Sequence, residues 1–247
     1  MTATAPRIVQ AEDLADENDL IKLYEAPGVG PWIRANFVAS VDGAIATNGT
    51  SSGLTTPLDQ QVLHLLRELA DVVLVGAGTI RAEDYIGIRV SDAGQQRRLA
   101  AGMSAVPPIA VVTGRADIDP KSRLLTNTLV PPIILTTAEA PAIAKRELEH
   151  AGATVLELGS SSIETSALIE ALTSLGLTRV TCEGGPVLTG QLAADHALDE
   201  LCLTTVPTIL GGTANRVTTG RFASLRVRCQ HIIMDADGAQ LARWVRA

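Results

Sequence analysis

Long apolar runs and aromatic side chains are scarce in this 247-residue sequence. Aromatic residues make up only 2% of the chain, so the core must be aliphatic, and stacking platforms for single-stranded nucleic acid are hard to assemble. No segment approaches the roughly 18 to 20 uninterrupted apolar residues of a membrane span, and the first residues lack the regions of a secretory signal. The formal net charge of −7 argues against a polyanionic partner. We therefore expect a cytoplasmic protein with no nucleic-acid or membrane partner.

Cysteine, histidine and lysine are also few. The three cysteines, Cys182, Cys202 and Cys229, lack CxxC spacing and lie in apolar runs, so we expect buried thiols rather than disulfides. The four histidines form no HxE or HExxH pattern. None of the three lysines lies in a candidate site, which disfavours Schiff-base chemistry. The sequence therefore predicts no metal centre.

The most informative feature that is present is the run Val72-Val73-Leu74-Val75, which leads directly into Gly76-Ala77-Gly78-Thr79. Four consecutive aliphatic residues are typical of a strand buried on both faces, and the two glycines allow a close approach of the backbone to a ligand. The pattern recurs where residues 178–182, a strand-like run, lead into Glu183-Gly184-Gly185-Pro186 and a helix. Either turn alone is a plain tight turn about as often as a ligand site. Together, two glycine turns at strand ends predict one shared crevice.

Strands and helices alternate along most of the chain, which predicts a largely parallel sheet covered by helices. The expected strands span residues 32–39, 72–75, 109–113, 133–136, 154–158, 178–182, 198–206, 226–234 and 241–246. The expected helices span residues 56–70, 141–150 and 163–175, with another that begins at Pro186. The last two strands have no helix-length insert between them, so antiparallel strands are expected at the C-terminal edge of the sheet. Residues 1–30 are acidic and irregular, which predicts an N-terminal arm with a short helix within residues 11–24, and residues 31–247 predict a single three-layer α/β domain.

The clearest helix start lies at Thr56-Pro57-Leu58-Asp59. Thr56 is a favoured N-cap, Pro57 suits the first helical position, and Asp59 is placed to accept a hydrogen bond from the amide of the cap. The preceding residues 48–56 are rich in Ser, Thr and Gly and too polar for the core. They predict a mobile or ligand-covering loop.

Several polar residues near the expected strand ends could carry chemistry. Pro186 at a helix start leaves backbone amides free to bind a pyrophosphate, and Glu183 just before it could hydrogen-bond a heterocycle or relay a proton. Asp42 is either a turn residue that bonds its own backbone or a polar group at the ligand-binding end of a strand. Arg67 is either a solvated residue on the polar side of its helix or a bidentate phosphate clamp.

The motifs, taken in order, resemble those of a known family. They are Asn36-Phe37-Val38-Ala39-Ser40-Val41-Asp42-Gly43, Ser51-Ser52-Gly53-Leu54-Thr55, Leu66-Arg67, Val75-Gly76-Ala77-Gly78-Thr79, Glu183-Gly184-Gly185-Pro186, Leu198-Asp199-Glu200-Leu201 and Val206-Pro207-Thr208-Ile209-Leu210-Gly211-Gly212. Each motif is short, but their combination is specific. From about Trp32 to the C-terminus, the chain resembles the reductase domain of riboflavin biosynthesis.

The resemblance implies a dihydrofolate-reductase-like fold and a homodimer that uses NADPH. The implied reaction reduces a 5-amino-6-(5-phosphoribosylamino)uracil-type substrate to its ribityl product. The chain departs from the family at Asn36, where the family often has Lys, and at Gly53, where it often has Trp. Arg89 is displaced by one position from the family's arginine. The zinc-binding PCxxC of the family's deaminase domain does not occur in this sequence, so we expect a reductase module alone.

We hypothesise an NADPH-dependent reductase whose catalytic residues are Glu183 and Asp42. The expected substrate-binding residues are Asn36, Ser40, Ser51, Arg67 and Arg89. The expected cofactor-binding residues are Val38, Gly53, Gly76, Ala77, Gly78, Thr79, Glu83, Thr113, Arg115, Gly184, Gly185, Pro186, Val187 and Leu188. Among them, Arg115 is expected to bind the extra phosphate of NADPH. Two alternatives stay open, namely a dihydrofolate or pteridine reductase on the same fold and a non-catalytic NADP-binding protein.

Overall fold

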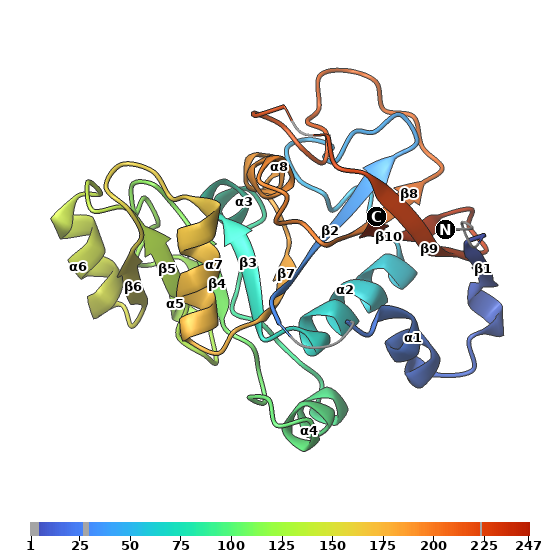
Figure 1. Cartoon of the computed structure of the whole chain (residues 1–247), viewed down its shortest axis with the longest axis horizontal. Coiled ribbons are helices and arrows are strands. Elements are labelled where there is room, and N and C mark those ends of the chain that lie inside the picture. The colour runs from blue at the N-terminus through green and yellow to red at the C-terminus, as the bar shows by residue number, and fades with distance from the viewer. Residues whose placement is uncertain (1–4, 27–29, 223) are drawn as a thin grey trace.

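One sheet runs through the whole molecule in the computed structural model, which describes residues 5–26, 30–222 and 224–247 (Figure 1). The strands are β1 (Arg7–Gln10), β2 (Trp32–Ser40), β3 (Val72–Gly76), β4 (Ile109–Val112), β5 (Ile133–Thr136), β6 (Thr154–Glu157), β7 (Arg179–Cys182), β8 (Glu200–Val206), β9 (Val227–Met234) and β10 (Gln240–Arg246). The helices are α1 (Glu17–Tyr24), α2 (Pro57–Leu69), α3 (Ala77–Ala82), α4 (Asp92–Ala100), α5 (Arg123–Thr126), α6 (Ala142–His150), α7 (Thr165–Ser174) and α8 (Pro186–Ala194). Across the sheet, the strand order is β1-β9-β10-β8-β2-β7-β3-β4-β5-β6.

Parallel pairing dominates the sheet. β7 lies between β2 and β3 and pairs in parallel with both, and β4, β5 and β6 continue in the same direction. On the other side of β2, β8 is also parallel, whereas β10 pairs antiparallel with β8 and β9. The predicted fold class is therefore confirmed as an α/β domain with a mixed, mostly parallel sheet and antiparallel C-terminal strands.

Helices cover both faces of the sheet and make it the middle of three layers (Figure 1). α7 and α8 pack on one face, where Leu168 and Leu192 join the same buried cluster as Leu74 of β3. Because successive side chains of a strand point to opposite faces, the neighbouring Val73 and Val75 face α3, α5 and α6 instead. α1 and α2 pack beside these helices over the β8, β9 and β10 side of the sheet.

The N-terminal segment contains regular structure, which the sequence does not predict for residues 7–10. β1 pairs in parallel with β9, so β1 forms this edge of the sheet in place of a C-terminal strand. Three of its four residues are exposed, and so short and polar a strand leaves little pattern in the sequence. α1 begins after Asp16, whose side chain accepts hydrogen bonds from the amides of Asn18 and Asp19. The division at residue 30 into an arm and a reductase domain stays a prediction.

A buried ion network fastens α1 to the sheet. Glu200 of β8 accepts hydrogen bonds from Arg34 Nε at 2.6 Å and from Arg243 Nη2 at 2.9 Å. Arg34 also donates to the backbone oxygen of Tyr24, at the end of α1. Burial alone would raise the pKa of Glu200, but the two guanidinium charges and their hydrogen bonds hold it below its usual value. The network therefore couples the N-terminal segment to three strands of the sheet.

Three short helices between β3 and β5 are absent from the sequence-based expectation. α3 begins directly in the glycine turn at Ala77, and its six residues are too few to show a helical period. α4 is capped by Ser91, whose hydroxyl accepts from the amide of Gly94, but it buries little apolar surface. α5 contains only four residues. Helices of this length are stabilised mainly by tertiary packing, which leaves little trace in the local sequence.

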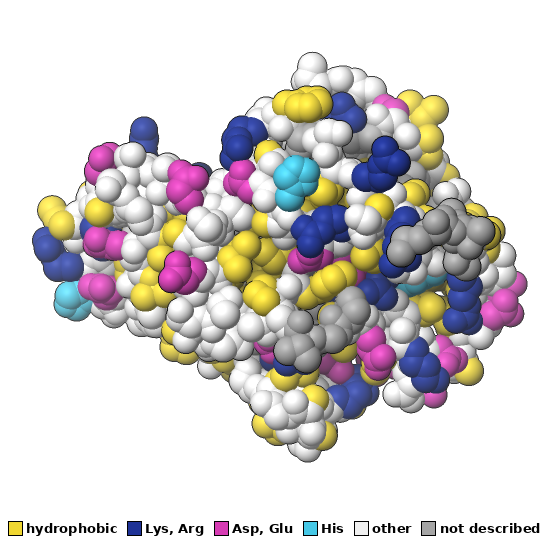
Figure 2. All heavy atoms as spheres, in the orientation of Figure 1, with side chains coloured by type: hydrophobic (Ala, Val, Ile, Leu, Met, Phe, Trp, Pro, Cys, Tyr) yellow, Lys and Arg dark blue, Asp and Glu magenta, His cyan; other side chains and the backbone are white. Residues whose placement is uncertain are grey.

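The surface of the molecule mixes charged and hydrophobic side chains. On the face shown in Figure 2, acidic and basic side chains are interspersed, and hydrophobic side chains gather near the middle. Within the described ranges, no helix is both long and apolar enough to span a bilayer. The same residues contain no cluster of three or more His, Cys, Asp or Glu side chains suited to a metal ion. Cys182 and Cys202 are buried as predicted, whereas Cys229 is partly exposed.

Candidate active site

The carboxyl ends of β2, β7 and β3 lie side by side, and glycine turns follow the last two. The amide of Gly76 donates to the carbonyl of Gly184 at 2.7 Å, so the two turns are in direct contact. Gly184 has a φ of +96°, which favours glycine, and its peptide bond to Gly185 is cis. A Cβ atom at Gly185 would lie 2.8 Å from Thr79 Oγ1. The predicted shared crevice is confirmed.

Two neighbouring cavities open at this end of the sheet. The larger one has a volume of about 740 Å³ and is lined from β2, α2, α3 and the turn before α8. The smaller one has a volume of about 500 Å³ and lies at the ends of β3 and β4. Both are lined by Gly76, Gly78, Val187 and Leu188. One extended ligand could therefore occupy both cavities, with room beside it in the larger one for a small second molecule.

A bidentate ion pair closes one side of the larger cavity. Arg67 Nε and Nη2 each donate to a carboxylate oxygen of Glu183 at 2.7 Å, and the hydroxyl of Tyr85 donates to Glu183 Oε2 at 2.7 Å. Burial and the charge of Glu183 raise the pKa of Tyr85 well above its usual value, so its hydroxyl keeps its proton. Burial would lower the pKa of Arg67, but Glu183 outweighs this effect and raises it. Arg67 Nη1 donates to none of the described residues and can therefore bind a ligand.

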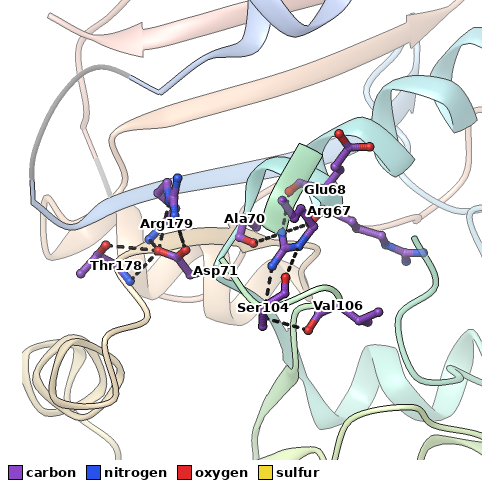
Figure 3. A network of polar contacts seen from close by, with 9 residues as sticks. Arg67, Glu68, Ala70, Asp71, Ser104, Val106, Thr178 and Arg179 are labelled. Carbon is purple, nitrogen blue, oxygen red and sulfur yellow. Dashed lines mark hydrogen bonds and ion pairs between the residues drawn. The ribbon is translucent and has the colours of Figure 1, made fainter. Parts of the chain in front are cut away.

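The end of α2 is anchored, and this anchoring fixes the backbone that carries Arg67. Asp71, just after the helix, pairs with Arg179 at the start of β7, with Nη2 and Oδ1 2.6 Å apart (Figure 3). Arg98 of α4 donates to backbone oxygens at the end of α2, two of them at 2.5 Å. The last carbonyl groups of a helix receive no hydrogen bond from within the helix, so Arg98 supplies the N–H donors that they lack.

The polar loop before α2 is tied to the cavity wall. Glu83, at the end of α3, accepts a hydrogen bond from the amide of Ser51 at 2.7 Å, and both residues line the larger cavity. At the base of the loop, Thr47 and Thr50 form an isolated bridge. A Cβ atom at Gly53 would lie 2.3 Å from Thr47 Cγ2, so a larger residue would require the Thr47 side chain to move. The expectation that this loop borders a ligand site is consistent with its position at the cavity.

Asp59 departs from the role that the helix start predicts. Its amide donates to Thr56 Oγ1 at 3.2 Å, as expected for a capped helix. Its carboxylate, however, turns away from the cap: Oδ1 accepts from Thr204 Oγ1 of β8 at 2.6 Å, and the side chain lines the larger cavity. Burial raises the pKa of Asp59 above its usual value. Asp59, Leu63 and Arg67 are spaced four residues apart, so one stripe of α2 faces the cavity.

The groups around the two cavities fit a dinucleotide cofactor. α8 begins with Pro186 and has no side-chain cap at Gly185, so its first backbone N–H groups lack an intrahelical acceptor and can bind a pyrophosphate. In the smaller cavity, Arg81 pairs with Asp117 at 3.1 Å. Arg115 also lines this cavity, and its guanidinium donates to no side chain or carbonyl of the described residues. Such an arginine can bind a further phosphate.

Most residues of the predicted site line one of the two cavities. Those at the larger cavity are Asn36, Val38, Ser51, Arg67, Gly76, Gly78, Thr79, Glu83, Glu183, Gly185, Pro186, Val187 and Leu188. Those found only at the smaller cavity are Ala77, Thr113 and Arg115. Their roles toward a ligand stay predictions.

The remaining predicted residues lie outside both cavity linings: Ser40, Asp42, Gly53, Arg89 and Gly184. Asp42 accepts hydrogen bonds from the Ser40 hydroxyl and from the amides of Leu210 and Gly211, which lower its pKa to about 2. Asp42 therefore fastens the loop after β8, and its position does not support the expected catalytic role. Arg89 donates to oxygens of Asn127 rather than facing the cavity.

The sequence alone does not predict that three further side chains line the cavity. Tyr85 belongs to none of the motifs that carry the family resemblance, so the resemblance gives no role for its hydroxyl. Arg123 lines the larger cavity from α5, an element that has no sequence signal, and it pairs with Asp84 at 2.8 Å. Asp59 follows a helix-start rule that already explains its presence. Only the four-residue spacing in the series Asp59, Leu63 and Arg67 could have indicated that the Asp59 carboxylate faces a ligand.

The mixed sheet, its two glycine turns and the two adjoining cavities place the protein in the class of α/β proteins with a ligand site at the carboxyl ends of their strands. The model of the RibD C-terminal domain matches residues 31–241, and the chain belongs to this family. Its relatives are pyrimidine reductases of riboflavin biosynthesis. The family recognised from the sequence is thereby confirmed, and the relatives favour neither the dihydrofolate or pteridine reductase nor the non-catalytic protein.

Individual relatives agree with this assignment. The chain is 30% identical to the 2,5-diamino-6-ribosylamino-4(3H)-pyrimidinone 5′-phosphate reductase of Methanothermobacter thermautotrophicus, over 74% of this chain and 80% of the relative. It is 28% identical to the reductase of the same name from Archaeoglobus fulgidus, over 74% and 83% of the two chains. Among solved structures, a pyrimidine reductase-like protein from Corynebacterium diphtheriae has a TM-score of 0.80 at 22% identity, covering 88% of this chain and 92% of the other.

Proposed function

We propose that this protein uses NADPH to reduce a ribosylaminopyrimidine 5′-phosphate of riboflavin biosynthesis to its ribityl product. The observation that carries the proposal is the junction of two cavities at Gly76, Gly78 and the start of α8. A dinucleotide needs such a junction for its pyrophosphate, and the larger cavity is of a size that holds a small second ligand beside it. The family match supports the same reaction class.

NADPH is proposed over NADH because of the smaller cavity. Asp117 already neutralises Arg81 there, whereas Arg115 retains its charge for a phosphate that only NADPH carries. The amides at the start of α8 would bind the pyrophosphate, and the glycine turns allow the backbone to approach it. When bound, NADPH supplies the hydride. The chain itself needs no nucleophile, only groups that hold two ligands in register.

Conversion of a ribosyl to a ribityl group adds a hydride to C1′ and a proton to the ring oxygen while the bond between C1′ and that oxygen breaks. In our proposal, Glu183 fixes the plane of the Arg67 guanidinium, and Arg67 Nη1 donates to the substrate. The hydroxyl of Tyr85 holds a proton beside Glu183 Oε2. The loop at Ser51, tied to Glu83, excludes water from that side of the cavity.

The substrate phosphate requires a cation that Arg89 does not supply. Arg123 lines the larger cavity, and its pair with Asp84 is exposed on both sides, with 57% and 64% of the two side chains accessible to solvent. Exposed ion pairs are weak, so a phosphate dianion can displace Asp84 as the partner of Arg123. We therefore propose Arg123 as the phosphate-binding residue.

The test is NADPH oxidation by the purified full chain with a panel of ribosylaminopyrimidine phosphates and pteridines. We expect turnover with a ribosylaminopyrimidine phosphate and formation of its ribityl product, detected by mass spectrometry. Turnover with dihydrofolate alone would support the first alternative. NADPH binding without turnover of any substrate would support the non-catalytic alternative.

We also propose that the protein is cytoplasmic and that it is a homodimer, as the family resemblance implies. Because β1 covers β9, a dimer cannot form by pairing of β9 strands in the way that exposed C-terminal edge strands would allow. The outer edge of β1, the β6 edge at the other end of the sheet or a helical face can then provide the contact. Light scattering on the purified chain measures the oligomeric state directly.

A further inference from the structure

The larger cavity contains a carboxylate that the mechanism above does not use. Asp59 is 5% exposed and lines the cavity from the first turn of α2. Its Oδ1 accepts from the Thr204 hydroxyl at 2.6 Å, and its Oδ2 accepts no hydrogen bond from the described residues. A buried carboxylate with one partner is costly unless something else supplies donors. Here, the free side of the carboxylate borders a ligand cavity.

The charge of Asp59 has no counterpart among the described residues that contact it. Arg67 lies eight residues further along α2, about 12 Å along the helix axis, and is already neutralised by Glu183. Two lining residues beside Asp59 are apolar, namely Val38, which pairs with Thr204 between β2 and β8, and Leu63, one turn further along α2. Asp59 therefore needs a ligand that brings N–H donors.

We propose that Asp59 is the specificity-determining residue that recognises a 2-amino-4-oxopyrimidine ring. In such a ring, the N3–H and the exocyclic 2-amino group are adjacent donors that point the same way, so one carboxylate accepts from both. Thr204 holds the carboxylate in place from β8. This inference rests on the proposed function, because it chooses between ring types within the same reaction.

The two rings named among the relatives differ at this position. The archaeal relatives are named for a 2,5-diaminopyrimidinone, which carries the 2-amino group, whereas a solved bifunctional homologue from Thermotoga maritima is named for a uracil. In uracil, the N3–H stands between two carbonyl oxygens. A carboxylate that accepts from N3–H then has its second oxygen against a carbonyl oxygen, which is repulsive. Asp59 therefore favours the 2,5-diaminopyrimidinone over the uracil-type substrate that the resemblance implies.

The test uses the full chain saturated with NADP⁺ or NADPH and compares three ligands. They are 2,5-diamino-6-ribosylamino-4(3H)-pyrimidinone 5′-phosphate, its 5-aminouracil counterpart, and dihydrofolate, a pteridine with the same 2-amino-4-oxo edge. Binding is measured by calorimetry and turnover by NADPH oxidation. We expect the wild-type chain to prefer the diaminopyrimidinone to the uracil by about 10- to 100-fold, as hydrogen bonds to a charged group imply.

Asp59→Asn provides the decisive comparison. An asparagine amide offers one acceptor and one donor, which matches the N3–H and carbonyl edge of uracil, so the preference should reverse. Asp92→Asn is the matched control, because Asp92 also lies in the first turn of a helix but is exposed and is not part of the cavity lining. A gain in affinity for uracil cannot arise from poor folding. Unchanged NADP⁺ affinity in both variants verifies an intact cofactor site.

The outcomes separate this inference from the proposed function. Equal affinity of the wild-type chain for both rings, or an unchanged ratio in Asp59→Asn, overturns the role of Asp59 even when turnover is normal. Binding and turnover of dihydrofolate that depend on Asp59, without turnover of either ribosylaminopyrimidine, support recognition of the ring and contradict the proposed reaction. If none of the three ligands binds, both the role of Asp59 and the proposed function are overturned.

Discussion

Glu183→Gln is the substitution that most sharply tests the polar wall of the larger cavity. The glutamine side chain keeps the shape of Glu183 but removes its charge and one of its acceptor oxygens. The carboxylate accepts two hydrogen bonds from Arg67 and one from Tyr85, each at 2.7 Å. An amide accepts on one side only and turns an NH₂ group toward donors on the other. Arg67 therefore loses its neutralising partner.

The structure sets the size of the effect. The side chains of Glu183 and Arg67 are 4% and 17% exposed, so Arg67 is left largely desolvated without its counter-ion. Breaking a buried ion pair from one side costs about 3 to 5 kcal/mol, and the partial solvent contact of Arg67 places our expectation at about 3 kcal/mol. A domain with a stability of about 5 to 15 kcal/mol still folds after such a loss. The variant can therefore be purified and assayed.

Urea unfolding followed by circular dichroism measures this loss as a lower transition midpoint with an unchanged slope. Turnover with the ribosylaminopyrimidine phosphate should fall, while the dissociation constant of NADPH stays nearly unchanged. Glu149→Gln on α6 is the control, because Glu149 is exposed and should alter neither quantity. Equal turnover and equal stability in Glu183→Gln would refute the role of this carboxylate.

Other residues give independent predictions. Arg115→Gln should raise the KM for NADPH about tenfold and leave the KM for NADH unchanged, because it removes a phosphate contact that NADH cannot make; steady-state kinetics with both cofactors decide this. Asp42→Asn should lower the melting temperature through the loop after β8 and leave turnover unchanged at a temperature where the variant is folded. Burial and nearby positive charge hold the pKa of His231 at about 4, below its usual 6.5, so the unfolded chain binds this proton more readily than the folded one. The free energy of unfolding should therefore fall by about 3 kcal/mol as the pH drops from 6.5 to 4. In His231→Gln, urea unfolding at a series of pH values should show a smaller fall over this range. A steep curve that persists in the variant would assign the effect to other groups.

The parts of the fold that the sequence predicts are those with strong local patterns. The aliphatic run of β3 and its glycine turn are visible in the sequence because burial on both faces demands consecutive apolar residues. β1 is not visible, because three of its four residues are exposed and its partner β9 lies more than two hundred residues away in the chain. Pairing over such distances is a tertiary effect that no local rule encodes.

In the candidate site, too, residues in local motifs are predictable, whereas roles that depend on distant partners are not. Glu183 and the glycine turns belong to short contiguous motifs, and they line the cavity as expected. Asp59 satisfies a helix-start rule through its backbone, yet its carboxylate finds Thr204 at a separation of 145 residues. Asp42 is the opposite case, since its position after a strand suggested chemistry but its hydrogen bonds hold a loop. In both cases, the partner that decides the role comes from β8 or the loop after it.

The most direct measurement of the central claim follows the hydride itself. The purified chain is incubated with NADPH deuterated at the transferable position and with the ribosylaminopyrimidine phosphate that it binds most tightly. We predict one deuterium at C1′ of the ribityl product, seen by mass spectrometry and NMR, for each NADPH consumed. A ribityl product without deuterium, or NADPH consumption without any ribityl product, would contradict the account.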